Sequence, residues 1–310
     1  MKKNDSLVSR RSFLGGLAAG GALAALPVFA RTRFKRVNLV FADVKIGLDT
    51  PFSALHISDT HLTLAHFDED PAAMNLSVDR TDAFGGDQLT ALRDSIGYAR
   101  QNKDIVLHTG DLSDYHSRAN FEQVKNFFGK NCAMMCAGNH EFARFEGWEY
   151  PEWIKRQREP EYKAFCAKLA QPYYPYNLTF DSRVINGVNF VGFDDTWEWI
   201  PDEVFDRFAD EVKKGLPIVI LCHVPFYTPA TEAAAKHYWG ADTAITGSPS
   251  LAAKHPKTNA FVERLRQEPL IKAVLAGDLH VTVHDRFSPT AMQYTVGGNY
   301  DRVACRISFS

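Results

Sequence analysis

The sequence has few cysteines, no strong excess of one charge, no internal repeat and no low-complexity tract. Its five cysteines are an odd number without the spacing of a disulfide framework, so we expect small buried core residues and no cross-links. A formal net charge of -2 over 310 residues, without a basic stripe, gives no general attraction to nucleic acid or an anionic membrane. Any recognition of phosphate must therefore come from a local site.

The first 30 residues have the features of a targeting segment. A basic start that contains Arg10 and Arg11 precedes a Gly/Ala/Leu-rich run over residues 13–28, and the small residue Ala30 stands before Arg31. The arginine pair resembles a twin-arginine export signal. The apolar run is short and rich in glycine, which favours cleavage over a stable membrane anchor. We therefore expect the twin-arginine machinery to export the folded protein to the periplasm or the exterior.

Residues 31–310 are long enough for one large domain, and an apolar fraction of 45% can fill its core. Apolar runs and alternating patterns predict strands at residues 37–46, 52–57, 105–107, 131–136, 188–193, 217–222 and 271–275. Amphipathic patterns predict helices at 88–100, 121–128, 201–214 and 259–267. Residues 62–86 are expected to be an irregular loop, and Asn186-Gly187 to be the turn of a hairpin. Alternating apolar residues after 281 predict antiparallel strands that close a second sheet.

Two further segments differ from the rest in composition. Residues 142–176 contain ten aromatic side chains, which either pack a small subdomain onto the core or form a lid over a substrate. In the second interpretation Arg144 would contact phosphate. Residues 226–257 are rich in Ala, Gly, Pro and Ser and include Tyr238 and Trp239. We expect a long, lid-like loop there, because loops of this length in compact domains are usually functional or mobile.

Polar side chains of metal-ligand type follow five of the expected strands. A polar side chain after a single strand is also typical of a surface turn. Its recurrence at the ends of five strands, however, is difficult to attribute to packing. The carboxyl ends of strands in open α/β sheets share one edge, and so many buried polar groups would be costly without a neutralising cation. A mixture of carboxylate, imidazole and amide ligands suits hard or borderline divalent ions. The residues are Asp59, His61, Asp111, Asn139, His140, His223, Asp278 and His280.

The ordered motifs resemble those of the calcineurin-like metallophosphoesterases over residues 53 to about 286. They are Asp59-x-His61, Gly110-Asp111-x-x-Asp114, Gly138-Asn139-His140-Glu141, His223 and Gly277-x-x-His280. The resemblance implies an α/β fold, a two-sheet β-sandwich flanked by helices in α/β/β/α order, with a dinuclear metal centre. By this resemblance one ion takes Asp59, His61, Asp111 and His280. The other takes Asp111, Asn139, His223 and the residue at 278, so that Asp111 bridges the two.

The resemblance also implies a reaction. Two divalent cations lower the pKa of a shared water and clamp the phosphoryl oxygens of an ester during attack. His140 would protonate the departing oxygen, or else would only make a supporting hydrogen bond beside the centre. Asp114 and Glu141 are expected to orient the metal ligands. We therefore expect a hydrolase of phosphodiesters or phosphomonoesters that acts on a small-molecule phosphate ester. The aromatic segments favour a nucleotide-like or otherwise bulky organic phosphate.

Asp278 departs from the family pattern, in which most relatives have histidine at this position. A third carboxylate at the centre would favour manganese or iron over zinc, although zinc stays possible. The alternative is that Asp278 leaves the second metal site weak. The protein would then be a non-catalytic protein that binds a phosphorylated ligand or metal on the same fold.

Overall fold

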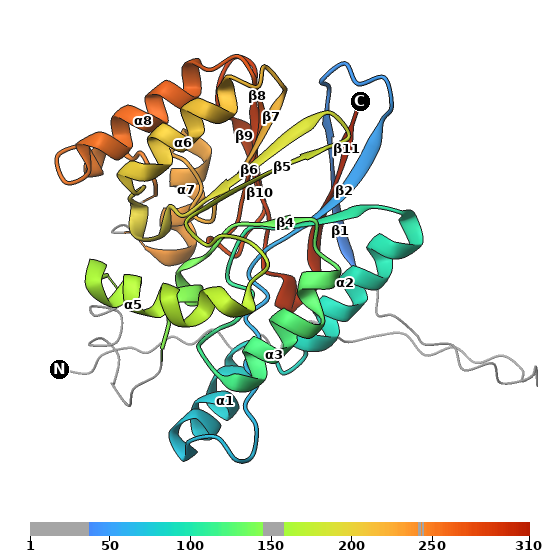
Figure 1. Ribbon diagram of the computed structural model, residues 1–310, viewed down its shortest axis with the longest axis vertical. Coiled ribbons are helices and arrows are strands. Elements are labelled where there is room, and N and C mark those ends of the chain that lie inside the picture. Colours follow the sequence, from blue (N-terminus) through green and yellow to red (C-terminus); the bar gives the residue numbers. More distant parts are fainter. Residues whose placement is uncertain (1–36, 145–157, 241–242, 244) are drawn as a thin grey trace, which may run out of the picture. The chain divides into compact units, whose positions relative to one another are not determined.

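The computed structural model of the chain describes residues 37–144, 158–240, 243 and 245–310. The expected signal peptide lies outside the described residues, as does the middle of the aromatic-rich segment. The described residues form two mixed β-sheets with helices on their outer sides (Figure 1). This is the two-sheet, helix-flanked architecture expected from the sequence.

The first sheet has the strand order β1-β11-β2-β3-β4. Its strands are β1 (Asn38–Val44), β2 (Phe52–Ile57), β3 (Ile105–His108), β4 (Met134–Met135) and β11 (Val303–Phe309). β11 runs parallel to β1, with Asn38 opposite Val303, and antiparallel to β2. The expectation that all C-terminal strands close the second sheet is therefore wrong for β11, because its pairing depends on partners more than 200 residues away that local patterning does not identify.

The second sheet has the order β5-β6-β7-β8-β10-β9. Its strands are β5 (Phe180–Ile185), β6 (Val188–Phe193), β7 (Ile218–Leu221), β8 (Ile271–Ala276), β9 (Val283–Arg286) and β10 (Met292–Thr295). β6, β7, β8 and β10 are parallel, and every residue of β6 and β7 is buried, as expected for strands covered on both faces. The Asn186-Gly187 hairpin is confirmed, with φ of 50° and 82° at its two turn residues.

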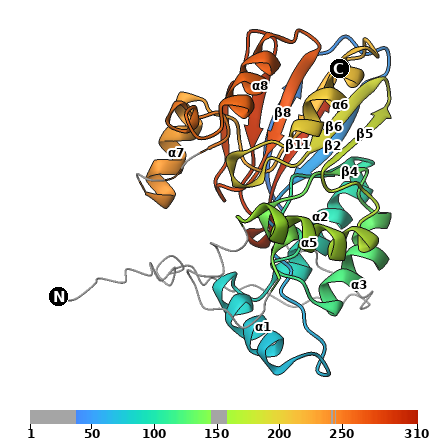
Figure 2. The same cartoon turned by 60° about the vertical axis from the view of Figure 1, so that its left-hand side comes forward.

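The helices are α1 (Pro71–Ala83), α2 (Gln88–Asn102), α3 (Arg118–Asn126), α5 (Pro160–Ala170), α6 (Asp202–Val212), α7 (Pro229–Trp239) and α8 (Pro256–Gln267). α2 packs on β2 and β3 of the first sheet. α6 and α8 cover the second sheet, as both views show (Figures 1 and 2). Phe208 of α6 and Phe261 of α8 share a buried apolar cluster with strand residues such as Val191.

Three expected elements are corrected. Residues 62–86 are not wholly irregular, since they contain α1, whose apolar residues do not repeat at a helical spacing. Residues 226–257 contain α7, which starts with Thr228 as N-cap and Pro229 at its first turn and continues through alanines. The expected strand over residues 131–136 is reduced to the two residues of β4.

The main core lies between the two sheets. It joins inward residues of the first sheet, such as Ile307 and Phe309, to inward residues of the second, such as Phe190 and Val219. All five cysteines are buried, as expected. The polar ends of β2, β3, β7 and β8 therefore emerge from a rigid, apolar support.

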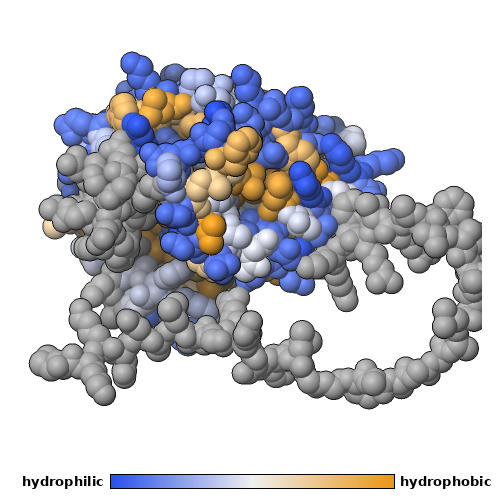
Figure 3. All heavy atoms as spheres, turned by 90° about the horizontal axis from the view of Figure 1, so that it is seen from below, coloured by the Kyte–Doolittle hydropathy of each residue, from blue (hydrophilic) through white to orange (hydrophobic). Residues whose placement is uncertain are grey.

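The surface seen from below is mostly hydrophilic and has a few hydrophobic areas (Figure 3). Among the helices of the described residues, none combines the length and apolar content that a membrane crossing needs.

Candidate metal centre

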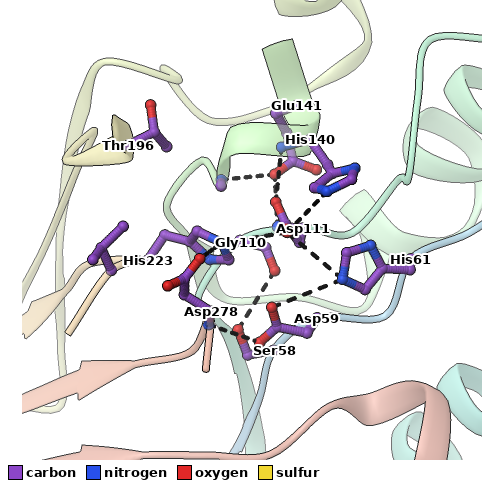
Figure 4. A network of polar contacts seen from close by, with 12 residues as sticks. Ser58, Asp59, His61, Gly110, Asp111, His140, Glu141, Thr196, His223 and Asp278 are labelled. Atoms are coloured by element: carbon purple, nitrogen blue, oxygen red, sulfur yellow. Dashed lines mark hydrogen bonds and ion pairs between the residues drawn. The ribbon is translucent and has the colours of Figure 1, made fainter. Parts of the chain in front are cut away.

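The expected metal ligands lie directly after strands of both sheets. In Figure 4 the labelled side chains of Asp59, His61, Asp111, His223 and Asp278 point toward one another. Asp59 and His61 follow β2, Asp111 follows β3, Asn139 follows β4, His223 follows β7, and Asp278 and His280 follow β8. The two sheets thus each contribute part of one cluster.

Asp111 has the central position in this cluster. Its Oδ2 lies 3.6 Å from His61 Nε2 and 3.3 Å from His223 Nε2. Asp59 Oδ1 lies 3.4 Å from His280 Nε2, and the Nε2 atoms of His61 and His280 are 3.1 Å apart. Asp278 Oδ1 lies 3.5 Å from His223 Nε2.

Among the described residues, three overlapping groups have donor atoms close enough to share a cation. Asp59 occurs in two of them, once with His61 and His280 and once with Asp111 and His223; His61, Asp111 and His140 form the third. Asp59 Oδ1 and His223 Nε2 are buried without a hydrogen-bond partner among the described residues. Leaving such atoms unpaired is costly, so divalent cations fit this donor set.

The backbone at these positions is strained. Asp59, His61, Asp111, Asp278 and His280 all have positive φ, between 49° and 63°. Residues other than glycine rarely adopt this conformation, and such strain concentrates at functional sites. The strain lets side chains that leave the strand ends turn toward the common centre.

Glycine is required at two neighbouring positions by close approach. A Cβ on Gly110, whose φ is +93°, would lie 2.6 Å from His223 Nδ1. A Cβ on Gly138 would collide with the carboxylate of Asp111. Both glycines of the motifs are therefore explained by the packing of the candidate ligands against the backbone.

Hydrogen bonds to the far ring nitrogens orient the histidines. His223 Nδ1 donates to the carbonyl of Thr109 at 2.7 Å, and His140 Nδ1 donates to the carbonyl of Asp114 at 2.6 Å. His61 Nδ1 donates to Asp114 Oδ1 at 2.9 Å. In each ring Nε2 is then the nitrogen directed to the centre, as in proteins where a second partner fixes a metal-binding imidazole.

Asp114 connects this centre to α1. Arg80 donates two hydrogen bonds to its carboxylate, from Nε at 2.6 Å and from Nη2 at 2.8 Å. Burial alone would raise the pKa of Asp114, but the charge of His140 and the hydrogen bonds from Arg80 and His61 hold that pKa below its usual value. The carboxylate is therefore ionised and can orient His61.

Glu141 ties two ligand-bearing loops together. Its carboxylate accepts backbone N–H bonds from Asp111 (2.8 Å), Leu112 (2.9 Å), Ser113 (3.2 Å) and Gly138 (2.7 Å). Burial, together with the charge of Asp111, raises its pKa to about 7. Glu141 thus acts on loop geometry, in the orienting role expected for it.

The surrounding protein disfavours the ionised form of the Asp278 carboxyl. Burial and the charges of Asp59 and Asp111 raise the pKa of this carboxyl to about 6. A cation between these carboxylates would reverse the effect. The Asp278 side chain is 30% exposed, in contrast to 4% for the Asp111 side chain.

The remaining expected residues, His140 and Arg144, are in different settings. His140 Nε2 lies 3.9 Å from Asp111 Oδ2, and its side chain is 13% exposed. The Arg144 guanidinium lies 5.5 Å from the ring centre of Phe165 in the aromatic-rich segment. The roles of both residues stay predictions.

Sequence reasoning missed several supporting residues. Buried Asp195, just after β6, accepts from the backbone N–H of His223 at 2.9 Å and of Val224 at 3.2 Å. A carboxylate after an apolar strand is the signal that identified Asp111, so Asp195 could have been found. Arg80 and Tyr300 carried no such signal, because α1 lacks an apolar stripe and Tyr300 lies in a short turn.

A search of curated proteins found no significant match. Among solved structures, a dimetal phosphatase from Danio rerio is 14% identical, with 82% of this chain and 91% of that chain covered and a TM-score of 0.47. A 5'-nucleotidase from Candida albicans is 14% identical, with 85% of this chain and 47% of that chain covered and a TM-score of 0.40. A Haemophilus influenzae NAD nucleotidase is 12% identical, with 84% of this chain and 48% of that chain covered and a TM-score of 0.39. The chain spans about half the length of these two nucleotidases.

The model of the calcineurin-like phosphoesterase family matches residues 52–282. This range is more than half of the chain, and it contains each of the candidate metal ligands described above. The chain therefore belongs to the calcineurin-like phosphoesterases, a family of enzymes.

Proposed function

We propose that the protein is an exported, metal-dependent hydrolase of phosphoric esters with a dinuclear centre. The observation that carries this proposal is the overlap of the candidate metal groups around Asp59 and Asp111, with His140 at their edge. A single cation would not use all of these donors. Two divalent cations, once bound, supply an activated water and a clamp for phosphoryl oxygens.

Each side chain then has a defined task. Asp59, His61, Asp111, Asn139, His223, Asp278 and His280 hold the cations. His140, whose Nδ1 is bonded to the carbonyl of Asp114, presents Nε2 and can donate a proton to the departing ester oxygen. Asp114 and Glu141 keep the histidines and loops in register. Because three carboxylates surround the centre, we propose manganese or iron as the preferred ion over zinc.

Substrate and location rest on sequence features. The aromatic-rich segment and Arg144 support a small organic phosphate ester, nucleotide-like in shape, as monoester or diester. The Arg10-Arg11 pair supports export of the folded protein by the twin-arginine machinery. We propose that residues 1–30 are the signal and that 31–310 act as one domain. Replacing both arginines by lysine should retain the protein in the cytoplasm, as fractionation would show.

The test combines metal content with hydrolysis of bis-nitrophenyl phosphate on the same purified protein. Wild type should contain two ions per chain and turn over, whereas Asp111→Asn should lose both properties. A variant Asp111→Asn that keeps two ions and full turnover would contradict the proposed centre.

A second candidate function is a binding protein, favoured by the 30% exposure of the Asp278 side chain and the raised pKa of its carboxyl. In that case the second metal site is weak. The variant Asp278→His distinguishes the two functions. Turnover that appears only in Asp278→His, with one ion or none in wild type, would favour binding without hydrolysis.

A further inference from the structure

The C-terminal end of α7 is fixed to a ligand-bearing loop. Ala235 of α7 is fully buried in a small apolar cluster with Val224, Ile245 and Leu279. Leu279 stands between the candidate ligands Asp278 and His280. The last turn of the helix therefore has a defined position relative to the metal centre.

Trp239, the last residue of α7, lies against a candidate metal ligand. Its Nε1–H donates to the carbonyl of Leu279 at 3.0 Å. Its ring centre is 5.4 Å from that of His280, with the two planes at 75°. Although the indole N–H is bonded and one edge is packed, the side chain as a whole is 56% exposed.

The other aromatic rings near His280 are occupied by the protein itself. Phe84 stacks on His61 with a centroid distance of 4.3 Å, and the Arg80 guanidinium lies 4.9 Å from its centre. The hydroxyl of Tyr300 is 3.2 Å from His280 Nδ1. Both side chains are half-buried. Trp239 differs because its indole is held in a fixed orientation beside His280 and still leaves most of its surface exposed to solvent.

We propose that Trp239 is a specificity-determining residue that packs against the apolar or aromatic group of the ester. The inference rests on the proposed function, which places the phosphoryl group of the ester at the neighbouring metal centre. An indole offers a broad uncharged face at a low cost in conformational freedom. It therefore favours esters that carry an aromatic or heterocyclic group over small aliphatic esters with the same phosphate charge.

The test measures binding without turnover. The manganese-loaded protein is titrated by calorimetry with phenylphosphonate and with methylphosphonate, two stable phosphoryl compounds that differ in the ring. Wild type should bind phenylphosphonate about tenfold more tightly, the scale of aromatic packing on an exposed face. Trp239→Ala should remove this preference by weakening only phenylphosphonate, and Trp239→Phe should retain part of it.

Tyr238→Ala is the matched control. Tyr238 precedes Trp239 on the same helix and is 60% exposed, but its ring contact is with His237. This variant should keep the wild-type preference. Metal content is measured in every variant, because the bond to Leu279 could also hold the ligand loop.

Two results would overturn the inference. One is equal affinity of wild type for both phosphonates. The other is a uniform loss of both affinities, or of metal, in Trp239→Ala and Trp239→Phe, which would make Trp239 a structural anchor. Hydrolysis is read separately: a protein that prefers phenylphosphonate but hydrolyses no ester would contradict the proposed function and leave the inference standing.

Discussion

At the scale of single residues, Asp195 shows how a buried carboxylate can act on a site through the backbone. It is fully buried and accepts from two consecutive backbone N–H groups, those of His223 and Val224, and from Thr246 Oγ1 at 3.1 Å. Its side chain therefore fixes the path of the chain where β7 delivers His223. Burial, opposed by the charge of His223, raises the pKa of Asp195 to about 7.

Replacing Asp195 by alanine should lower both stability and metal affinity. Each buried donor left without an acceptor costs about 1–3 kcal/mol, so the loss of the acceptor for the two backbone N–H groups should lower the free energy of unfolding by about 2–6 kcal/mol. Metal affinity should fall by about 10- to 100-fold, as for other residues that orient a ligand. Urea denaturation and metal titration measure the two effects.

The variant Thr246→Val is the control for Asp195→Ala, because it removes one of the three hydrogen bonds and leaves the backbone contacts. It should lose less stability and keep its metal affinity. Equal metal affinity in wild type and Asp195→Ala would show that His223 is positioned without Asp195.

At the scale of elements, α5 is joined to the end of β6 by a buried ion pair. Lys163 of α5 is 6% exposed, and its Nζ lies 2.6 Å from Asp194 Oδ2. The same ammonium group lies 5.0 Å from the ring centre of Phe142 and 4.8 Å from that of Trp199. This pair links α5, within the aromatic-rich segment, to the strand that precedes Asp195.

Replacing Lys163 by methionine should destabilise the protein although methionine fills similar space. The carboxylate of Asp194 would remain buried without its cation, and breaking a buried pair in this way costs about 3–5 kcal/mol. The double variant Lys163→Met with Asp194→Asn should recover part of that loss, since no charge is left unpaired. Thermal and urea unfolding measure the stability of the single and double variants. Strictly additive losses from the two substitutions would contradict an energetic coupling between Lys163 and Asp194.

Sequence reasoning succeeded for elements whose signal is local. β2 and β6 have the expected bounds, because each is a mostly apolar run flanked by turn residues. α7 was missed because alanines give a helix no apolar stripe, although Thr228 and Pro229 mark its start. The sheet position of β11 could not be predicted, since strand pairing across the chain has no local pattern.

The candidate site likewise contains residues with a local sequence signal and residues without one. Each expected ligand follows a strand, so a motif within a few residues identifies it. Arg80 and Tyr300 contact the site from other elements, and only the folded chain brings them to Asp114 and His280. Contacts made across the fold are therefore the part of the site that spacing alone does not reveal.

At the scale of the whole molecule, the candidate metal centre takes its ligands from both sheets, and removal of the proposed cations should weaken the fold. Asp59, His61, Asp111 and His223 are 3% exposed or less, and without cations their charges and lone pairs face one another. A ligand present at about 100 times its Kd stabilises a folded protein by about 2.7 kcal/mol. For a chain of this size that corresponds to roughly 4–5 °C in Tm.

Chelation should therefore lower the Tm of the metal-loaded protein by several degrees, and excess manganese should restore it. Differential scanning calorimetry measures the change. Asp111→Asn, which we expect to bind metal poorly, serves as the control and should respond little to the chelator. A wild-type Tm that is unaffected by complete metal removal would show that the centre does not stabilise the fold.

The position of β11 has a consequence for how the protein is made. In the described sheet β1 pairs only with β11, which ends at Phe309 and also separates β1 from β2. A nascent chain that has grown as far as His280 already contains every proposed ligand but not the strand that completes the first sheet. β1 therefore has no strand to pair with until the last strand has been synthesised. A premature stop after His280 would give a chain that contains all the proposed ligands but lacks the strand between β1 and β2.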